Sequence, residues 1–176
     1  GDDIIYSSER GEFFGGAGND TFHISTGGTQ TFDGGDGIDL FKMDLTEYTP
    51  PDKAMVNGKF TLEVDLENGI SKALGVDHTP DTLISIENIE ILGSHDTKLT
   101  GNAEDNNIKG ADGIDLIYGG DGNDDISGND GNDIIDGGNG DDVVRGGAGD
   151  DMITGGAGDD MLRGAKGDEV IDGGAG

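Results

Sequence analysis

Large aliphatic residues recur at every ninth position through residues 101–176. Glycine-rich polar stretches separate them, so each nine-residue frame predicts about six residues of turn and three of strand. A strand this short becomes stable only when neighbouring frames stack their aliphatic residues into one core. The pattern therefore predicts a solenoid of short β-strands. The aliphatic column consists of Ile108, Ile117, Ile126, Ile135, Val144, Ile153, Leu162 and Ile171.

The sixth position of each frame forms a second fixed column, two residues before the aliphatic one. Stacked carboxylates repel one another, and one aliphatic residue per frame buries too little apolar surface to offset the entropy of ordering the frame. A hard divalent cation that prefers oxygen ligands would supply the missing stabilisation. The column consists of Asn106, Asp115, Asp124, Asp133, Asp142, Asp151, Asp160 and Glu169.

The frames at 119–127 and 146–154 follow the pattern G-G-x-G-x-D-x-U-x, where U is a large aliphatic residue. This pattern resembles the RTX (repeats-in-toxin) nonapeptide, a calcium-binding repeat of bacterial secreted proteins. The resemblance implies an all-β fold, a right-handed parallel β-roll in which two frames make one coil and turns alternate between two sides. Calcium would lie between a turn and the turn two frames later, held by position-six carboxylates and by backbone carbonyls of the glycine-rich turns.

The resemblance also implies which residues would share calcium ions. The Gly101 frame departs most from the pattern, because Glu104 replaces a glycine and Asn106 replaces the aspartate, so a site there is expected to be weak or absent. The implied pairs are Asp124 with Asp142 and Asp142 with Asp160 on one side, and Asp115 with Asp133, Asp133 with Asp151 and Asp151 with Glu169 on the other.

Residues 1–46 contain a degenerate form of the same repeat. Asp3, Asp20 and Asp39 each occupy the sixth position of a turn, at separations of 17 and 19 residues, which are close to one coil. We therefore expect them to stack as a second calcium-binding side. The opposite turns, around 9–12 and 25–30, lack the aspartate and are expected to bind no metal. The core candidates are Ile5, Phe14, Phe22, Phe32 and Phe41.

Residues 47–100 lose the repeat, which predicts a metal-free, less regular β segment between 1–46 and the regular roll of 101–176. Phe60, Leu62, Val64 and Leu66 alternate with polar residues as in a half-buried strand, and Asn57-Gly58 is a hairpin signal. Residues 82–92 form another aliphatic run. Leu99 lies nine residues before Ile108, which indicates that the roll continues into the regular array.

The composition is strongly acidic, with 38 Asp and Glu against 10 Lys and Arg and a formal net charge of −28. Such a charge disfavours nucleic acid and anionic membranes as partners. The chain has no cysteine, hence no disulfide, and no apolar run long enough to span a membrane. Both ends lie within a motif, so we expect a piece of a larger exoprotein with flanking domains.

Other chemistries have less support. The sequence does not fit an EF-hand, because Ile126 stands where that calcium-binding loop needs glycine. We also expect no enzyme, because the histidines His23, His78 and His95 lie in unrelated sequence contexts. If turns alternate, Lys109, Ser127, Arg145 and Arg163 stack on one sheet, either to bind an anionic polysaccharide or to balance charge. On the other sheet Leu116, Ile134, Met152 and Val170 stack, either to dock a neighbouring domain or because of their β-propensity.

These observations predict a calcium-dependent folding module. The resemblance implies that it is unfolded during export through a type I channel and folds outside the cell in calcium, where it supports secretion and stability of its parent. Two alternatives stay open. The chain is a polysaccharide-binding accessory module of a secreted enzyme, or a structural segment of an adhesin or surface-layer protein.

Overall fold

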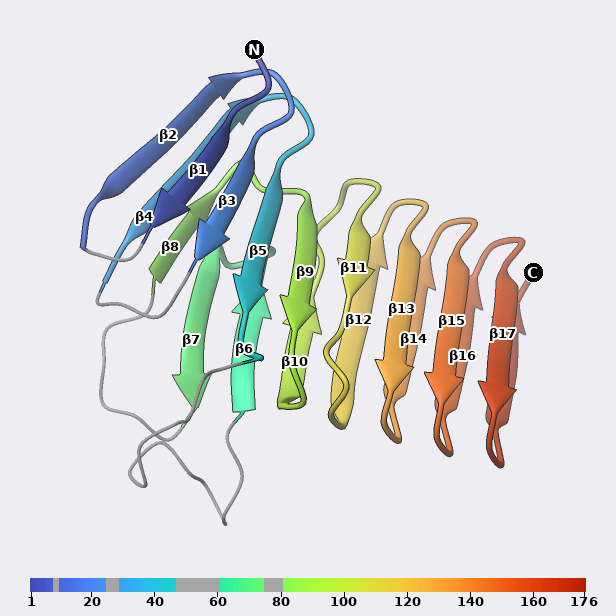
Figure 1. Ribbon diagram of the computed structural model, residues 1–176. Coiled ribbons are helices and arrows are strands. Elements are labelled where there is room, and N and C mark those ends of the chain that lie inside the picture. The colour runs from blue at the N-terminus through green and yellow to red at the C-terminus, as the bar shows by residue number, and fades with distance from the viewer. Residues whose placement is uncertain (8–9, 25–28, 47–60, 75–80) are drawn as a thin grey trace.

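The computed structural model describes residues 1–7, 10–24, 29–46, 61–74 and 81–176, and every regular element in these ranges is a β-strand. Two sheets face each other (Figure 1). The eight-stranded sheet has the order β1-β3-β5-β9-β11-β13-β15-β17, and the ten-stranded sheet has the order β18-β16-β14-β12-β10-β6-β7-β8-β4-β2. Consecutive strands therefore alternate between the sheets, except at β6, β7 and β8. The prediction of an all-β roll is confirmed.

The strands are short, as the nine-residue frames require. Their bounds are β1 Ile4–Ser7, β2 Glu12–Ala17, β3 Thr21–Ile24, β4 Thr31–Asp36, β5 Leu40–Asp44, β6 Thr61–Asp65, β7 Ile70–Leu74, β8 Asp81–Ile84, β9 Asn88–Leu92, β10 Asp96–Thr100, β11 Asn107–Lys109, β12 Asp115–Asp121, β13 Asp125–Asp130, β14 Ile134–Asn139, β15 Val143–Ala148, β16 Met152–Ala157, β17 Met161–Lys166 and β18 Val170–Ala175.

The strands of the regular array pair in parallel at the spacing of two frames. Ile108 pairs with Ile126, which pairs with Val144 in the eight-stranded sheet. The same register holds in the ten-stranded sheet, where Ile117 pairs with Ile135. Each coil therefore places one aliphatic side chain from each sheet against the previous coil. Evenly spaced strands from β9 to β18 form the regular part of the roll (Figure 1).

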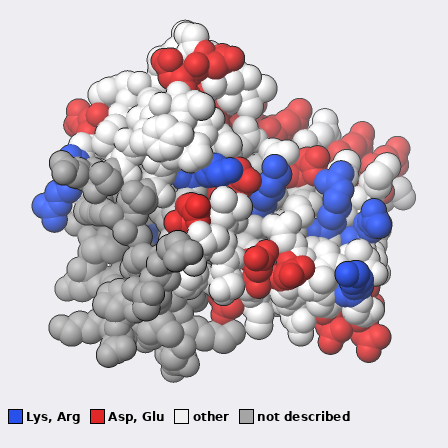
Figure 2. Space-filling model, in the orientation of Figure 1, with Lys and Arg blue, Asp and Glu red and all other residues white. Residues whose placement is uncertain are grey.

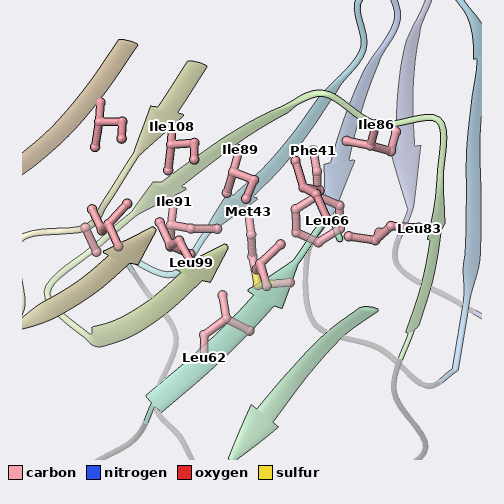
Figure 3. Packing of buried hydrophobic residues seen from close by; sticks show 14 of the residues in the cluster. Phe41, Met43, Leu62, Leu66, Leu83, Ile86, Ile89, Ile91, Leu99 and Ile108 are labelled. Atoms are coloured by element: carbon pink, nitrogen blue, oxygen red, sulfur yellow. The ribbon is translucent and has the colours of Figure 1, made fainter. Parts of the chain in front are cut away.

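The aliphatic column is the core of the roll. Ile108, Ile117, Ile126, Val144 and Ile153 are fully buried and belong to one continuous cluster with the residues of the preceding coils. Figure 3 shows how residues from β5, β9, β10 and β11 gather between the sheets. In the last coil Leu162 is partly buried and Ile171 is 46% exposed, because no further strand covers that edge.

The N-terminal coils have an aromatic core, and one predicted member of it is wrong. Phe14 is 63% exposed, whereas Phe13 packs against the cluster and stacks on Phe32 with ring centroids 5.4 Å apart. Phe22 and Phe41 are fully buried, as predicted. The side-chain alternation of a strand allows only one of the two neighbours to point inward. Phe13 lies nine positions before Phe22, but Phe14 lies nine positions after Ile5, so the spacing alone does not choose between them.

The middle segment inserts an antiparallel hairpin, β6–β7, into the ten-stranded sheet between β8 and β10. β5 and β9 are nevertheless direct neighbours in the other sheet. Leu62, Val64 and Leu66 are buried, as their alternation predicts, while Phe60 and Asn57-Gly58 lie outside the described residues.

The turn of the β6–β7 hairpin spans residues 66–69. Gly69 has a φ of 63°, and Asp65 accepts hydrogen bonds from Asn68 N at 2.9 Å and Asn68 Nδ2 at 2.8 Å. Glu63 fastens the hairpin, because its carboxylate pairs with Lys98 at 2.6 Å on β10 and with Lys72 at 2.7 Å on β7.

Candidate metal centre

Two columns of turn residues run along the edges of the roll, each residue lying within one position of the start of a strand. The first column serves the eight-stranded sheet and consists of Asp3, Asp20, Asp39, Glu87, Asn106, Asp124, Asp142 and Asp160. The second column serves the ten-stranded sheet and consists of Thr97, Asp115, Asp133, Asp151 and Glu169. The three N-terminal aspartates thus stack in the same column as Asp124, with Glu87 and Asn106 in between, and do not form a separate side.

Within each column, one carboxylate oxygen accepts the backbone N–H of the turn one coil earlier. Asp124 N donates to Asp142 Oδ1 at 2.9 Å, and Asp142 N donates to Asp160 Oδ1 at 3.0 Å. In the second column, the same bond joins Asp115 to Asp133, Asp133 to Asp151 and Asp151 to Glu169 at 2.8–3.1 Å. Asp3 N and Asp20 N donate to the next aspartate at 2.7 Å. The structure therefore brings together every predicted pair.

The second oxygen of most of these carboxylates is buried and accepts no hydrogen bond from the described residues. Asp124, Asp133, Asp142 and Asp151 are each no more than 2% exposed. Leaving a buried anionic oxygen without a partner costs more than any single hydrogen bond returns. The unpaired atoms are Oδ2 of Asp20, Asp39, Asp124, Asp133, Asp142, Asp151 and Asp160, and Oε1 of Glu169.

At several turns, the unpaired carboxylate oxygen and a backbone carbonyl oxygen of the next coil lie close to the same point. A Cβ added to Gly119 would lie 2.3 Å from Asp124 Oδ2 and 2.2 Å from the Gly137 oxygen. Two oxygens with partial or full negative charge thus converge above a glycine. Carboxylate and carbonyl oxygens are the ligands that calcium prefers. The same arrangement joins Asp20 with the Gly34 carbonyl, Asp133 with Gly146, Asp142 with Gly155 and Asp160 with Gly173.

Burial dominates the electrostatics of the columns. It raises the pKa of Asp115 and of Asp133 to about 7 and that of Asp124 to about 6, although backbone N–H groups oppose the shift. Burial also raises the pKa of Asp142 and Asp151, and neighbouring carboxylates add to the effect. Burial therefore disfavours the charged form of these carboxylates, and a bound cation would offset that cost.

Two turns in the array differ because they satisfy their own position-six side chain. Asp115 Oδ2 accepts Ala111 N at 2.9 Å, and its Oδ1 accepts both Thr97 N and Thr97 Oγ1. Asn106 Oδ1 accepts Asn102 N at 2.8 Å, and its Nδ2 donates to the Glu87 carbonyl at 2.7 Å. Neither side chain is left with an unpaired atom among the described residues.

A second ladder of side chains, not predicted from the sequence, lies at position five of the frame. Here the side-chain oxygen accepts the backbone N–H of the following coil, opposite in direction to the position-six bonds. Asp105, Asn123 and Asp141 each do so at 2.7–2.8 Å. The recurrence of Asn or Asp at this position is the signal that could have revealed it. The other members are Asp2, Asn19, Asp96, Asn132 and Asp150.

In the described part of the chain no three His, Cys, Asp or Glu side chains gather at one point. Each turn contributes only one position-six carboxylate, so an ion between two turns would have at most two carboxylate ligands, and its remaining ligands would be backbone carbonyls. This donor set fits calcium, which accepts mixed carboxylate and carbonyl oxygens in variable number, better than a metal that needs several side-chain ligands.

The RTX calcium-binding nonapeptide repeat matches residues 12–23 and, in overlapping segments, 100–135, 118–153, 127–162 and 145–176, which together cover just over half of the chain. The chain belongs to this family. RTX repeats are structural calcium-binding modules, and the matched residues contain most of the turns with unpaired oxygens. None of the curated proteins compared with the chain matches it.

The basic residues of the RTX module form the predicted stripe on the eight-stranded sheet. Lys109, Ser127, Arg145 and Arg163 pair in register on β11, β13, β15 and β17. Figure 2 shows basic side chains across this face and acidic ones along the turns. Arg145 is ion-paired with Asp125, while Ser127, Arg145, Arg163 and Lys166 line a groove of about 480 Å³.

The opposite face carries the predicted aliphatic stripe. Leu116, Ile134, Met152 and Val170 pair in register on the outer face of the ten-stranded sheet. Ile134 is 47% exposed and Met152 50%. Among the described residues of the module, no helix is long and apolar enough to cross a membrane.

Proposed function

We propose that this RTX module is a calcium-dependent folding unit of a larger exoprotein. It stays unfolded at low free calcium and folds into the roll at the millimolar calcium found outside cells, where it supports secretion, folding and stability of its parent. One observation carries the proposal. A row of buried carboxylate oxygens has no partner among the described residues, and each of several faces a backbone carbonyl of the next coil.

The position of these oxygens explains why folding would be cooperative. Each candidate site lies between two coils, so an ion bound there orders both turns and prepares the next site along the column. Ions that bind only the folded chain shift the folding equilibrium by mass action. Without them, a net charge of −28 opposes compaction. RTX repeats are typically found in secreted bacterial proteins, which agrees with a switch that operates on leaving the cell.

The test is far-UV circular dichroism of the chain during a calcium titration, with magnesium as the control ion. We expect a cooperative change from coil to β-structure with calcium and little change with magnesium, which is smaller and gives up its water reluctantly. A chain that is fully folded in chelator, or that responds equally to magnesium, would contradict the proposal. The proposal assigns no catalytic step to any residue.

A second candidate function is binding of an anionic polysaccharide, which the groove beside Arg145 and Arg163 favours. Guanidinium groups pair well with carboxylates, and stacked strands repeat them at a regular spacing. We expect Arg163→Gln to weaken retention of the calcium-loaded chain in a polyuronate gel without changing its circular dichroism. Equal migration of both proteins with and without polyuronate would leave charge balance as the role of the stripe.

A further inference from the structure

The turn before β9 carries no glycine repeat, yet it faces Asp39 as a repeat turn would. We propose that Asp39, the Ser85 carbonyl and Glu87 hold a further calcium ion, which fastens the N-terminal coils to the rest of the roll. The choice of calcium rests on the proposed function, whereas the site rests on its own geometry. Neither Ser85 nor Glu87 belongs to a segment that matches the repeat family.

Asp39 is fully buried, and its two carboxylate oxygens have different surroundings. Oδ1 accepts the backbone N–H of Asp20 at 2.7 Å. Oδ2 accepts no hydrogen bond within the described residues. A Cβ added to Gly34 would lie 2.2 Å from this Oδ2 and 2.1 Å from the Ser85 carbonyl oxygen. Both oxygens therefore converge on one point, as Asp124 Oδ2 and the Gly137 carbonyl do above Gly119.

Glu87 completes the likeness to a repeat turn. Its Oε2 accepts Asp39 N at 2.7 Å, which is the bond that Asp142 makes with Asp124 elsewhere in the first column. Glu87 thus occupies position six of a turn in which Ser85, with a φ of 49°, adopts the left-handed conformation. Two carboxylates meet here, and no ion pair joins either of them to a lysine or arginine of the described residues. A cation is the missing partner.

The far side of the same turn needs no ion. Asn106 Nδ2 donates to the Glu87 carbonyl at 2.7 Å, and Asn102 Nδ2 donates to the Ile86 carbonyl at 3.4 Å. Side-chain amides therefore occupy the space between this turn and the next coil. The site is confined to the side that faces Asp39.

The proposed ion would link turns that are 48 residues apart in sequence, on either side of the inserted hairpin. Elsewhere in the columns the linked turns are 17 to 19 residues apart. This ion would close the longest loop in the roll and align β5 with β9, so the register of the N-terminal coils would depend on it.

The experiment counts calcium ions on the full chain by native mass spectrometry at saturating calcium. Glu87→Gln keeps an oxygen that accepts Asp39 N but removes the charge, and we expect it to carry one calcium fewer than the unmodified chain. Glu104→Gln, the same change at an exposed turn residue, is the matched control and should keep the full count. An unchanged count in Glu87→Gln overturns this site alone. A chain that binds no calcium overturns the proposed function as well.

A second measurement uses the unmodified chain and therefore does not require any variant to fold. In a crystal of the calcium-loaded chain, we expect an anomalous difference peak about 2.3–2.6 Å from Asp39 Oδ2 and the Ser85 oxygen. A peak between the turns of Asp124 and Asp142 without one at Asp39 would overturn the inference.

Discussion

The turns of residues 119–169 and the turns that contain Asn106 and Asp115 share one sequence pattern but treat their position-six side chain differently. In the former, one carboxylate oxygen of each turn has no partner among the described residues. In the latter, the backbone N–H of Asn102 or Ala111 satisfies the corresponding oxygen. An unpaired carboxylate oxygen is therefore a property of single turns and not of the repeat as a whole.

The backbone at position two separates the two groups of turns. Asn102 and Ala111 are not among the residues with positive φ, whereas Asn129 has a φ of 79° and Ala165 a φ of 102°. A positive φ turns the position-two N–H away from the carboxylate, and a non-glycine residue accepts it only at some cost. Every described turn with an unpaired oxygen has this feature, at Gly16, Gly35, Gly120, Asn129, Gly138, Gly147, Gly156 and Ala165.

Removal of calcium should expose this difference most strongly. We expect the amides of β13 to β18 to exchange with solvent at least about 100-fold faster when calcium is lowered, because these coils lose their cations. The amides of β11 and β12, which follow the self-satisfied turns of Asn106 and Asp115, should be the last to lose protection. Hydrogen exchange read by mass spectrometry at stepwise calcium concentrations measures both. Simultaneous loss in all coils would show that the two groups of turns do not differ in their need for calcium.

Asp142→Asn should weaken calcium-dependent folding. The amide keeps an oxygen for Asp124 N but places a donor where the unpaired oxygen lies. We expect a loss of about 2 kcal/mol of calcium-dependent stability, seen as a higher midpoint in a calcium titration. Asp141→Asn is the control, because its exposed side chain accepts Asp159 N and an amide can still do so. Equal midpoints for the two variants would argue against Asp142 as a ligand.

Asn106→Asp should convert a turn whose position-six side chain is fully hydrogen-bonded into one that needs a cation. The new carboxylate cannot donate to the Glu87 carbonyl, which Asn106 does at 2.7 Å. At low calcium we expect a loss of roughly 1–3 kcal/mol in the opening free energy of β11, from the broken bond and the added charge. Hydrogen exchange of β11 checks this. Asn107→Asp, at the exposed neighbour, should change little.

Acid should partly replace calcium. The folded-state pKa of Asp115 and Asp133 is about 7 and that of Asp124 about 6, all above their ordinary value. A raised folded pKa gives stability that is complete below the unfolded pKa of about 4 and is lost as pH rises through the folded value. In chelator we therefore expect more β-structure at pH 5 than at pH 8 by circular dichroism. Equal spectra at both values would contradict it.

The sequence predicted what depends on local and periodic signals. The nine-residue period correctly predicted that the aliphatic residues from Ile108 to Ile153 lie in the core and that Asp124 lies next to Asp142. It could do so because a parallel solenoid repeats its contacts at a fixed separation. Asn68-Gly69 marks the β6–β7 turn by the same type of signal as Asn57-Gly58, which lies outside the described residues.

The remaining features follow from no fixed period in the sequence. Pairing of β4 with β8, and contact between Asp39 and Glu87, follow from where the hairpin inserts, which no period reveals. The choice between Phe13 and Phe14 depended on a one-residue shift in strand alternation. Whether Asp115 Oδ2 accepts a hydrogen bond from its own turn depended on the φ of Ala111, which the residue type alone does not determine.

The inserted hairpin also shapes the whole roll. Between β4 and β10 the ten-stranded sheet contains the three strands β6, β7 and β8, whereas the facing sheet contains only β9 between β5 and β11. At a strand spacing of about 4.8 Å, two additional strands lengthen one layer by about 10 Å. Layers that share one core can differ in length only if their common axis bends, and β1 to β5 do fan away from the later strands in Figure 1. The roll is therefore bent at the inserted hairpin. A force that pulls β1 to β5 away from the later strands would act first on the contact between Asp39 and Glu87.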